Sequence, residues 1–287
     1  GYNASDRAYR TMDRMDRIQA FMMLGDSVYM DIVEWLPFRV TDIKNMYRIH
    51  RLAMSTRGFK SLFSRIPYYS IPDDHEYRDD AHPGYRDEEP EVYNAARDAI
   101  NTFMNFNGPL PTRSTIPLWA QFKQAGIPFF MADTRYERDN SRGKIMSNRQ
   151  MNRLKRALLE PRDINIPCFI MSAAPFALQS RNEDTWAGYP EQQESLVRFI
   201  NRRRINNVFI LTGHPHCSVC TRFRIRDQDN IYSNIDIVEI MSSGLYHFNI
   251  SRDERDQYFN RHRMIEYTLE SQDDLDALRS YVVRKDN

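Results

Sequence analysis

The sequence predicts an α/β fold in which central β-sheets are flanked by helices. Short apolar runs typical of buried strands are separated by segments with helical periodicity, and the clearest run is Val208–Leu211, which is followed by Gly213. The chain has 287 residues, of which 41% are hydrophobic and 28% charged, so it has enough apolar surface for a globular fold. We predict one domain over residues 1–250 and a charged C-terminal extension over 251–287 that packs on the same domain.

The individual elements follow from cap residues, apolar spacing and breakers. In the first half of the chain we predict a helix (Ser5–Arg17), a strand (Ala20–Leu24), a helix capped by Thr41 that ends near Phe63, a strand (Ile66–Ile71), a polar loop (Tyr77–Pro90) and a helix (Glu91–Phe106). In the second half we predict a hairpin (Leu118–Phe122 with Ile127–Ala132), a helix (Ser147–Glu160), a strand (Ile166–Ser172), a helix (Glu191–Arg204), the Val208 strand, an antiparallel pair (Val219–Arg226 with Ile231–Met241) and a helix (Asp273–Val282).

Two histidines, His214 and His216, follow the Val208–Leu211 strand, with Pro215 between them. In an extended segment, residues two apart point the same way, so both imidazoles are expected to face one point beyond the strand. Ligands of open α/β sheets bind at the carboxyl ends of the strands. The segment is therefore read either as two nitrogen ligands to a metal or as a loop with one core histidine and one exposed histidine.

Three other predicted strands also end in ionisable side chains. Each of these clusters alone also fits a turn or a helix cap. We expect the sheet to place the carboxyl ends of these strands on one edge, so four clusters together favour a shared site. A mixture of carboxylates and imidazoles suits zinc, manganese, iron or a hard cation. The clusters are Asp26 after the first strand, Asp73, Asp74 and His75 after the second, Asp133 and Arg135 after the hairpin, and the histidine pair.

Composition argues against several other functions. Lys+Arg 40 against Asp+Glu 39 gives a net charge of +1, so there is no strong signal for nucleic-acid binding. No apolar run is long enough to span a membrane, and no signal segment is visible, so we expect a protein that is cytoplasmic or exported with its signal removed. Cys168, Cys217 and Cys220 are too few for a disulfide framework and are interpreted as strand packing, with a redox or metal role as the alternative. Sequence motifs of serine hydrolases, P-loop proteins and dinucleotide-binding proteins are absent. The sequence carries no signal for an oligomeric state.

The order of these polar clusters resembles the calcineurin-like metallophosphatases, and more fully the PhoD-like alkaline phosphatase and phosphodiesterase family. The resemblance covers roughly residues 7–244, and several linked motifs in order are more specific than any one alone. The matching segments are Gly25-Asp26-Ser27-Val28-Tyr29, Asp73-Asp74-His75-Glu76 preceded by Pro72 where tryptophan is usual, Asp133-Thr134-Arg135, Trp186-Ala187-Gly188-Tyr189-Pro190 and Glu239-Ile240-Met241-Ser242-Ser243-Gly244.

The resemblance implies a four-layer αββα sandwich with two mixed sheets and a binuclear metal site that hydrolyses small phosphoesters. The metals would be divalent or trivalent ions (two or more of Fe, Zn, Mn or Ca) that activate a water molecule. His75 would protonate the leaving oxygen, and Arg135 would either hold the phosphate or form a buried salt bridge to Asp133. The implied metal ligands are Asp26, Asp74, His214 and His216, with Asp73 and Asp133 as further candidates.

Three departures from the family pattern keep a second function open. The family's first ligand strand is absent or altered in this sequence, and Gly213-His214-Pro215-His216 replaces the usual Gly-Asp-x-His. Glu137 stands where the family often has a tyrosine that binds iron, with Tyr136 one position earlier. The alternative is therefore a catalytically impaired metallophosphatase-fold protein that acts as a binding or interaction module.

Overall fold

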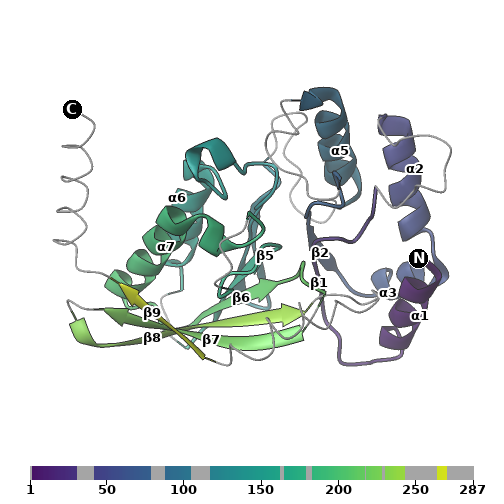
Figure 1. Ribbon diagram of the computed structural model, residues 1–287. Coiled ribbons are helices and arrows are strands. Elements are labelled where there is room, and N and C mark those ends of the chain that lie inside the picture. Colours follow the sequence, from purple (N-terminus) through teal and green to yellow (C-terminus); the bar gives the residue numbers. More distant parts are fainter. Residues whose placement is uncertain are drawn as a thin grey trace.

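The computed structural model describes residues 2–30, 42–78, 88–104, 117–161, 165–178, 183–216, 218–227, 230–242 and 264–269. Two β-sheets lie between two groups of helices (Figure 1), which confirms the predicted α/β class. The helices are α1 (Tyr2–Met12), α2 (Ile43–Met54), α3 (Arg57–Phe63), α5 (Pro90–Phe103), α6 (Asn148–Ala157) and α7 (Pro190–Arg203). The strands are β1 (Phe21–Leu24), β2 (Tyr68–Ile71), β3 (Ala120–Gln124), β4 (Ile127–Met131), β5 (Cys168–Ser172), β6 (Val208–Thr212), β7 (Ser218–Asp227), β8 (Asn230–Ser242) and β9 (Met264–Leu269).

The two sheets differ in size. Strands β1 and β2 pair in parallel and form a two-stranded sheet. The other sheet has seven strands in the order β3-β4-β5-β6-β8-β7-β9, and β4, β5, β6 and β8 run parallel to one another. The hairpin between β3 and β4 turns through Ala125 and Gly126, whose φ angles of 51° and 81° suit a type I′ turn.

Alternating side chains of the large sheet build a separate core on each of its faces, as expected for a sheet covered on both sides. Phe129 and Met131 of β4 pack in a cluster with Ile71 of β2. Phe130, which lies between them in the sequence, packs in another cluster with Leu196 of α7. Helices α6 and α7 therefore cover one face of the large sheet, and the small sheet covers the other (Figure 1).

The small sheet is itself covered on its outer face. Tyr69 of β2 stacks on Phe122 of the large sheet, with ring centroids 3.8 Å apart. The neighbouring Tyr68 points the other way and contacts Phe63 of α3, with centroids 4.8 Å apart. The layers are thus helices, large sheet, small sheet and helices, which is the predicted αββα order.

The structure corrects two of the predicted helices. The helix expected from Thr41 to Phe63 is two helices, because the side chain of Thr56 accepts a hydrogen bond from the backbone N–H of Phe59 and begins α3. Asp42 caps α2, and Thr41 lies outside the described residues. Helix α1 ends at Met12, five residues before the predicted end at Arg17.

The C-terminal extension is only partly described. Strand β9 belongs to it and pairs in parallel with β7. The predicted helix Asp273–Val282 lies outside the described residues, and the division at residue 250 stays a prediction. Among the described helices, none has the length and apolar character needed to cross a membrane.

Candidate metal centre

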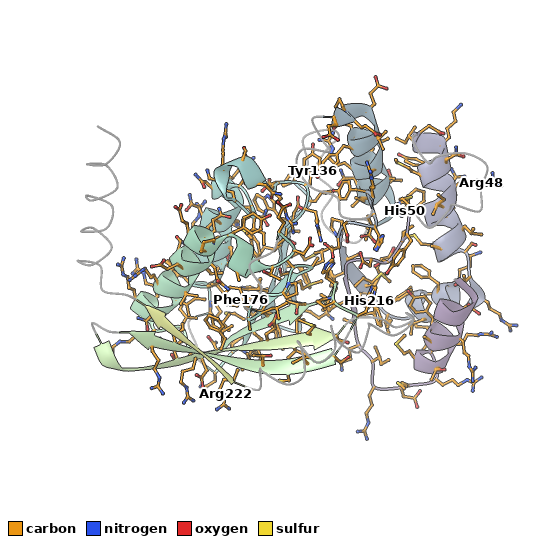
Figure 2. The ribbon with its side chains drawn as sticks, viewed as in Figure 1. Arg48, His50, Tyr136, Phe176, His216 and Arg222 are labelled. Atoms are coloured by element: carbon orange, nitrogen blue, oxygen red, sulfur yellow. The ribbon has the colours of Figure 1, made fainter. Side chains whose placement is uncertain are left out.

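The carboxyl ends of β1, β2, β4 and β6 meet, although these strands belong to two sheets rather than to the single sheet edge that the sequence analysis assumed. The two sheets pack face to face, and this brings the loops that follow their strands together. Each of Asp26, Asp73, Asp74 and His214 offers a ligand atom, and these atoms all lie within 4.8 Å of one another. His216 lies at the same junction, between the large sheet and the N-terminal helices (Figure 2).

Glycines allow the loops to approach this closely. Gly25 has a φ of +94°, and a Cβ atom there would lie 2.5 Å from the Cβ of Asp73. A Cβ atom at Gly213 would collide with the carbonyl oxygen of Leu24. Both glycines are therefore required where the β6 loop and the β2 loop pass the end of β1.

Three of the candidate ligands have left-handed backbone conformations. The φ angles are 52° at Asp26, 70° at His214 and 44° at His216. This region is uncommon for residues other than glycine and is typical of functional sites that the surrounding structure holds in place. The extended geometry expected for the histidine pair is therefore wrong, although its two side chains still reach one site.

Asp73 is the most tightly bound carboxylate of the group. Its Oδ1 accepts a hydrogen bond from Nε of Arg135, and its Oδ2 lies 2.7 Å from Nδ1 of His214. Burial alone would raise the pKa of Asp73, but these two cationic neighbours hold it below its usual range. Burial alone would lower the pKa of His214, and the charge of Asp73 raises it well above its usual value instead.

Asp26 has the opposite electrostatic environment. Burial and the neighbouring carboxylates, first Asp73 and then Asp74, raise its pKa well above the usual value. Its Oδ1 is buried and accepts no hydrogen bond from the described residues. A buried carboxylate oxygen without a partner, crowded by other carboxylates, is stabilised by a cation, so the donor set fits a metal.

His216 and His75 are linked through one tyrosine. The hydroxyl of Tyr29 lies 3.3 Å from Nε2 of His216, and the same nitrogen lies 3.9 Å from Oδ2 of Asp26. The ring of Tyr29 also stacks against the imidazole of His75. The candidate general acid is thus placed beside the candidate ligands, and Tyr29 adds an oxygen donor to which the sequence analysis gave no role.

Asp133 lies apart from this group of donors. Its Oδ1 accepts hydrogen bonds from the backbone N–H groups of Arg135 and Tyr136, at 3.0 and 2.8 Å. Gln150 brackets its backbone, accepting from the N–H and donating to the carbonyl. Burial, and then the charge of Glu137, raise the pKa of Asp133 to about 7. Its Oδ1 thus shapes the loop after β4, whereas its Oδ2 is buried without a hydrogen-bond partner among the described residues.

Arg135 forms its buried ion pairs with residues other than Asp133. Besides Asp73, its Nη1 lies 2.8 Å from Oδ1 of Asp184, and the same oxygen lies 3.3 Å from Nη1 of Arg138. Only 1% of the Arg135 side chain is exposed. Its ion-pair partners are thus Asp73, Asp184 and, at 3.7 Å, Asp74. Asp184 was not among the candidate site residues of the sequence.

Glu137, which stands where the family often has a tyrosine, and its neighbour Tyr136 both form hydrogen bonds outside the group of candidate ligands. Glu137 accepts hydrogen bonds from Nε1 of Trp119, from Ser147 and from Gln150. The hydroxyl of Tyr136 accepts a hydrogen bond 2.6 Å long from Arg97 of α5. Both side chains therefore connect loops and helices, and the donors described above do not include them.

The fold and the site together define an α/β protein with a cluster of carboxylates and imidazoles where two sheets meet. A family model, PhoD-like phosphatase, matches residues 2–279, and the chain belongs to this family. This confirms the resemblance found in the sequence, and with it the predicted family.

The chain is also similar to individual known proteins. The chain is 40% identical to alkaline phosphatase D of Bacillus subtilis (strain 168) over 42 residues, which are 15% of this chain and 7% of that protein. It superposes on a solved structure of PhoD with a TM-score of 0.69 at 19% identity, over 84% of this chain and 53% of the other, which confirms the fold. It also matches a dimetal phosphatase from Danio rerio with a TM-score of 0.48 at 14% identity, over 86% and 79% of the two chains. The chain thus spans about half the length of the solved PhoD.

Proposed function

We propose that this protein is a metal-dependent phosphoester hydrolase that acts on small phosphomonoesters or phosphodiesters. The observation that carries the proposal is the group of four ligand atoms from Asp26, Asp73, Asp74 and His214 within 4.8 Å of one another. Membership of the PhoD-like phosphatase family supports the reaction class. The donor types suit two or more ions of Fe, Zn, Mn or Ca.

Asp26, Asp74, His214 and His216 would hold these ions, with Asp73 beside them. When bound, metals in such a centre lower the pKa of a water molecule and neutralise charge on phosphate oxygens. The buried Oδ1 of Asp26, which has no hydrogen-bond partner among the described residues, would be stabilised by such a cation. Asp133 lies outside the four-donor group: its Oδ1 accepts two backbone hydrogen bonds, its buried Oδ2 has no hydrogen-bond partner among the described residues, and its role as a further ligand stays a prediction.

His75 is the proposed general acid, and Arg135 the residue that fixes Asp73. His75 is half-buried and lies against Tyr29, which in turn contacts His216, so its imidazole proton is close to the proposed ligands. It would pass that proton to the leaving oxygen of the ester. Arg135 is buried and already paired with Asp73 and Asp184. This favours a role in orienting Asp73 over direct contact with the phosphate.

Two substrates and one metal titration test the proposal. The protein is stripped with a chelator and then supplied separately with Mn²⁺, Zn²⁺, Fe³⁺ or Ca²⁺. Hydrolysis of p-nitrophenyl phosphate and of its bis-ester is followed under each condition. We expect no turnover without metal and turnover with at least one ion, and the faster substrate assigns monoesterase or diesterase preference. Turnover that is unchanged after metal removal would contradict the proposal.

A non-catalytic binding module is the second candidate, and one observation favours it. Both oxygens of Asp73 are already engaged, by Arg135 and by His214, so part of the site is electrostatically satisfied by the protein itself. A protein that binds no metal under any of the conditions above, and turns over neither ester, would support the module.

A further inference from the structure

The carboxylate of Glu76 lies buried between the loop that follows β1 and the loop that follows β2. Its Oε1 accepts the backbone N–H groups of Ser27 at 2.6 Å and Val28 at 2.9 Å. Its Oε2 accepts those of Asp26 at 3.1 Å and Asp73 at 2.8 Å. One carboxylate group therefore receives four backbone hydrogen bonds, and none of the side chain is exposed to solvent.

These bonds join two segments that are far apart in the sequence. Ser27 and Val28 directly follow the candidate ligand Asp26, and Asp73 directly precedes the candidate ligand Asp74. Buried N–H groups that lose their acceptor each cost about 1–3 kcal/mol, so the loops depend on Glu76 for their relative position. The left-handed backbone at Asp26 is also held by this contact, because the N–H of Asp26 is one of the four donors.

We infer that Glu76 is a positioning residue of the metal centre, which fixes the spacing between the ligands on the β1 loop and those on the β2 loop. The inference rests on the proposed function, because it concerns the affinity of the same site for metal. Glu76 would not touch the metal itself, since both of its oxygens face backbone N–H groups. Its contribution is to hold Asp26 and the β2 loop that carries Asp74 within reach of one ion before that ion arrives.

A glutamine at this position would have the size of Glu76 but could not replace it. The amide has one oxygen and one NH₂ group, and the NH₂ group cannot accept a hydrogen bond. Whichever way the amide is turned, two of the four backbone N–H groups would face a donor. Residues that orient metal ligands from behind typically change metal affinity about 10–100-fold when substituted.

The chain contains a matched control in Glu239. Its side chain is also buried, and it accepts the backbone N–H groups of Phe176 at 2.7 Å and Ala177 at 3.0 Å, and the hydroxyl of Thr212 at 2.9 Å. Glu239 thus organises a loop by the same chemistry, but the two N–H groups it binds belong to a loop without proposed ligands. Glu239→Gln should therefore cost stability without the same loss of metal affinity.

The test compares the wild-type protein, Glu76→Gln and Glu239→Gln after metal removal. Mn²⁺ binding is measured by isothermal titration calorimetry, and folding by near-ultraviolet circular dichroism and thermal melting in chelator. We expect both variants to melt below wild type. We expect Glu76→Gln to bind Mn²⁺ about 10–100-fold more weakly, and Glu239→Gln to stay within about threefold of wild type. The Mn²⁺ concentration needed for half-maximal hydrolysis should rise in parallel for Glu76→Gln.

Equal Mn²⁺ affinity in wild type and Glu76→Gln overturns the inference and leaves the proposed function standing, whereas a wild type that binds no metal overturns both. An equal loss in both variants also overturns the inference, because it indicates general destabilisation. If Glu76→Gln does not fold, backbone amide exchange in metal-free wild type decides. The amides of Ser27 and Val28 should exchange as slowly as those of Phe176 and Ala177, and fast exchange would overturn the inference.

Discussion

The ring of Tyr29 stacks against the imidazole of His75, with centroids 4.1 Å apart and planes inclined by 34°. Through its hydroxyl, the same tyrosine reaches His216. This relationship connects the end of the β1 loop with the two residues whose roles are most clearly separable, a general acid and a metal ligand. The two proposed roles, general acid for His75 and metal ligand for His216, can be tested independently.

His75→Ala should lower kcat for a p-nitrophenyl ester by about 10²–10⁴, because that range is typical of a lost general acid. Mn²⁺ affinity should be unchanged, since His75 is not among the proposed ligands. The measurement is steady-state kinetics at saturating Mn²⁺, together with calorimetry. Full turnover by the variant would show that the general-acid assignment is wrong.

Asp26→Asn should separate metal binding from folding. Burial and the nearby carboxylates raise the pKa of Asp26, so its ionised form is disfavoured in the folded, metal-free protein. The resulting destabilisation of the folded protein is absent below the pKa that Asp26 has in the unfolded chain, and it grows as the pH rises above that value. Asparagine cannot ionise, so the substitution removes this destabilisation. At pH 8 in chelator, we expect the variant to melt at or above the wild-type temperature.

Added metal should reverse the order of the two melting temperatures, so that the wild type melts above Asp26→Asn. Added Mn²⁺ stabilises the folded wild type by mass action, and the variant lacks the charged oxygen that would bind it. Differential scanning fluorimetry with and without Mn²⁺ gives the comparison. An equal rise in melting temperature for both proteins would exclude Asp26 as a ligand.

Arg135→Ala should be strongly destabilising, by about 3–5 kcal/mol, because it removes the guanidinium partner of the buried Asp73 and leaves that carboxylate with His214 alone. Arg142→Ala is the control, since Arg142 is 74% exposed and its pair with Asp139 is expected to contribute less than about 1 kcal/mol. Urea unfolding of both variants measures the difference. Similar unfolding free energies for the two would contradict the structural role given to Arg135.

Gly25→Ala should cost more stability than Gly126→Ala. Both glycines have positive φ angles, 94° at Gly25 and 81° at Gly126, so both substitutions carry a backbone cost of about 1–2 kcal/mol. At Gly126 a Cβ atom meets nothing within 4 Å, whereas at Gly25 it would lie 2.5 Å from the Cβ of Asp73. The extra loss at Gly25, and a weakened affinity for Mn²⁺, report the close approach of the two loops.

His50 should make stability fall at acidic pH. Its imidazole is fully buried against Phe103, with centroids 5.2 Å apart, and burial lowers its pKa from 6.5 to about 4. Between pH 6.5 and 4 the unfolded chain takes up a proton at His50 and the folded chain does not. The stability that the neutral, buried imidazole contributes is therefore fully present above pH 6.5 and is lost as the pH falls from 6.5 to 4.

The expected loss is on the order of 3 kcal/mol, at about 1.4 kcal/mol per unit of pKa. His50→Phe should remove this part of the acid dependence and be more stable than wild type at pH 5. The free energy of unfolding of both proteins, measured between pH 4 and 8, tests this. Parallel curves would show that His50 does not contribute.

Much of the candidate site could be predicted because its residues stand directly after apolar strands. Asp26, Asp74 and His214 were found this way, since a strand places the next side chain at a sheet end. The partition into two sheets could not be predicted by that route, because strand pairing between β1 and β2 depends on contacts nearly fifty residues apart in sequence. The αββα layering came instead from the family resemblance.

The supporting residues were harder to recognise. Asp184 pairs with Arg138, 46 residues away, and three of the four backbone hydrogen bonds to Glu76 come from residues 48 to 50 positions away, so the local sequence does not reveal these partners. The helix break at Thr56 did have a local signal, because a threonine followed by a glycine two residues later fits an N-cap better than a helix interior.

The left-handed backbone at Asp26, His214 and His216 has a practical consequence for engineering. Each of these conformations costs a residue other than glycine about 1–2 kcal/mol, and glycine would relieve that cost. A library selected for heat tolerance alone would therefore enrich glycine at these three positions and discard the side chains that are proposed to bind metal. Variants of this protein that are selected for heat tolerance therefore also need to be screened for activity in every round of selection.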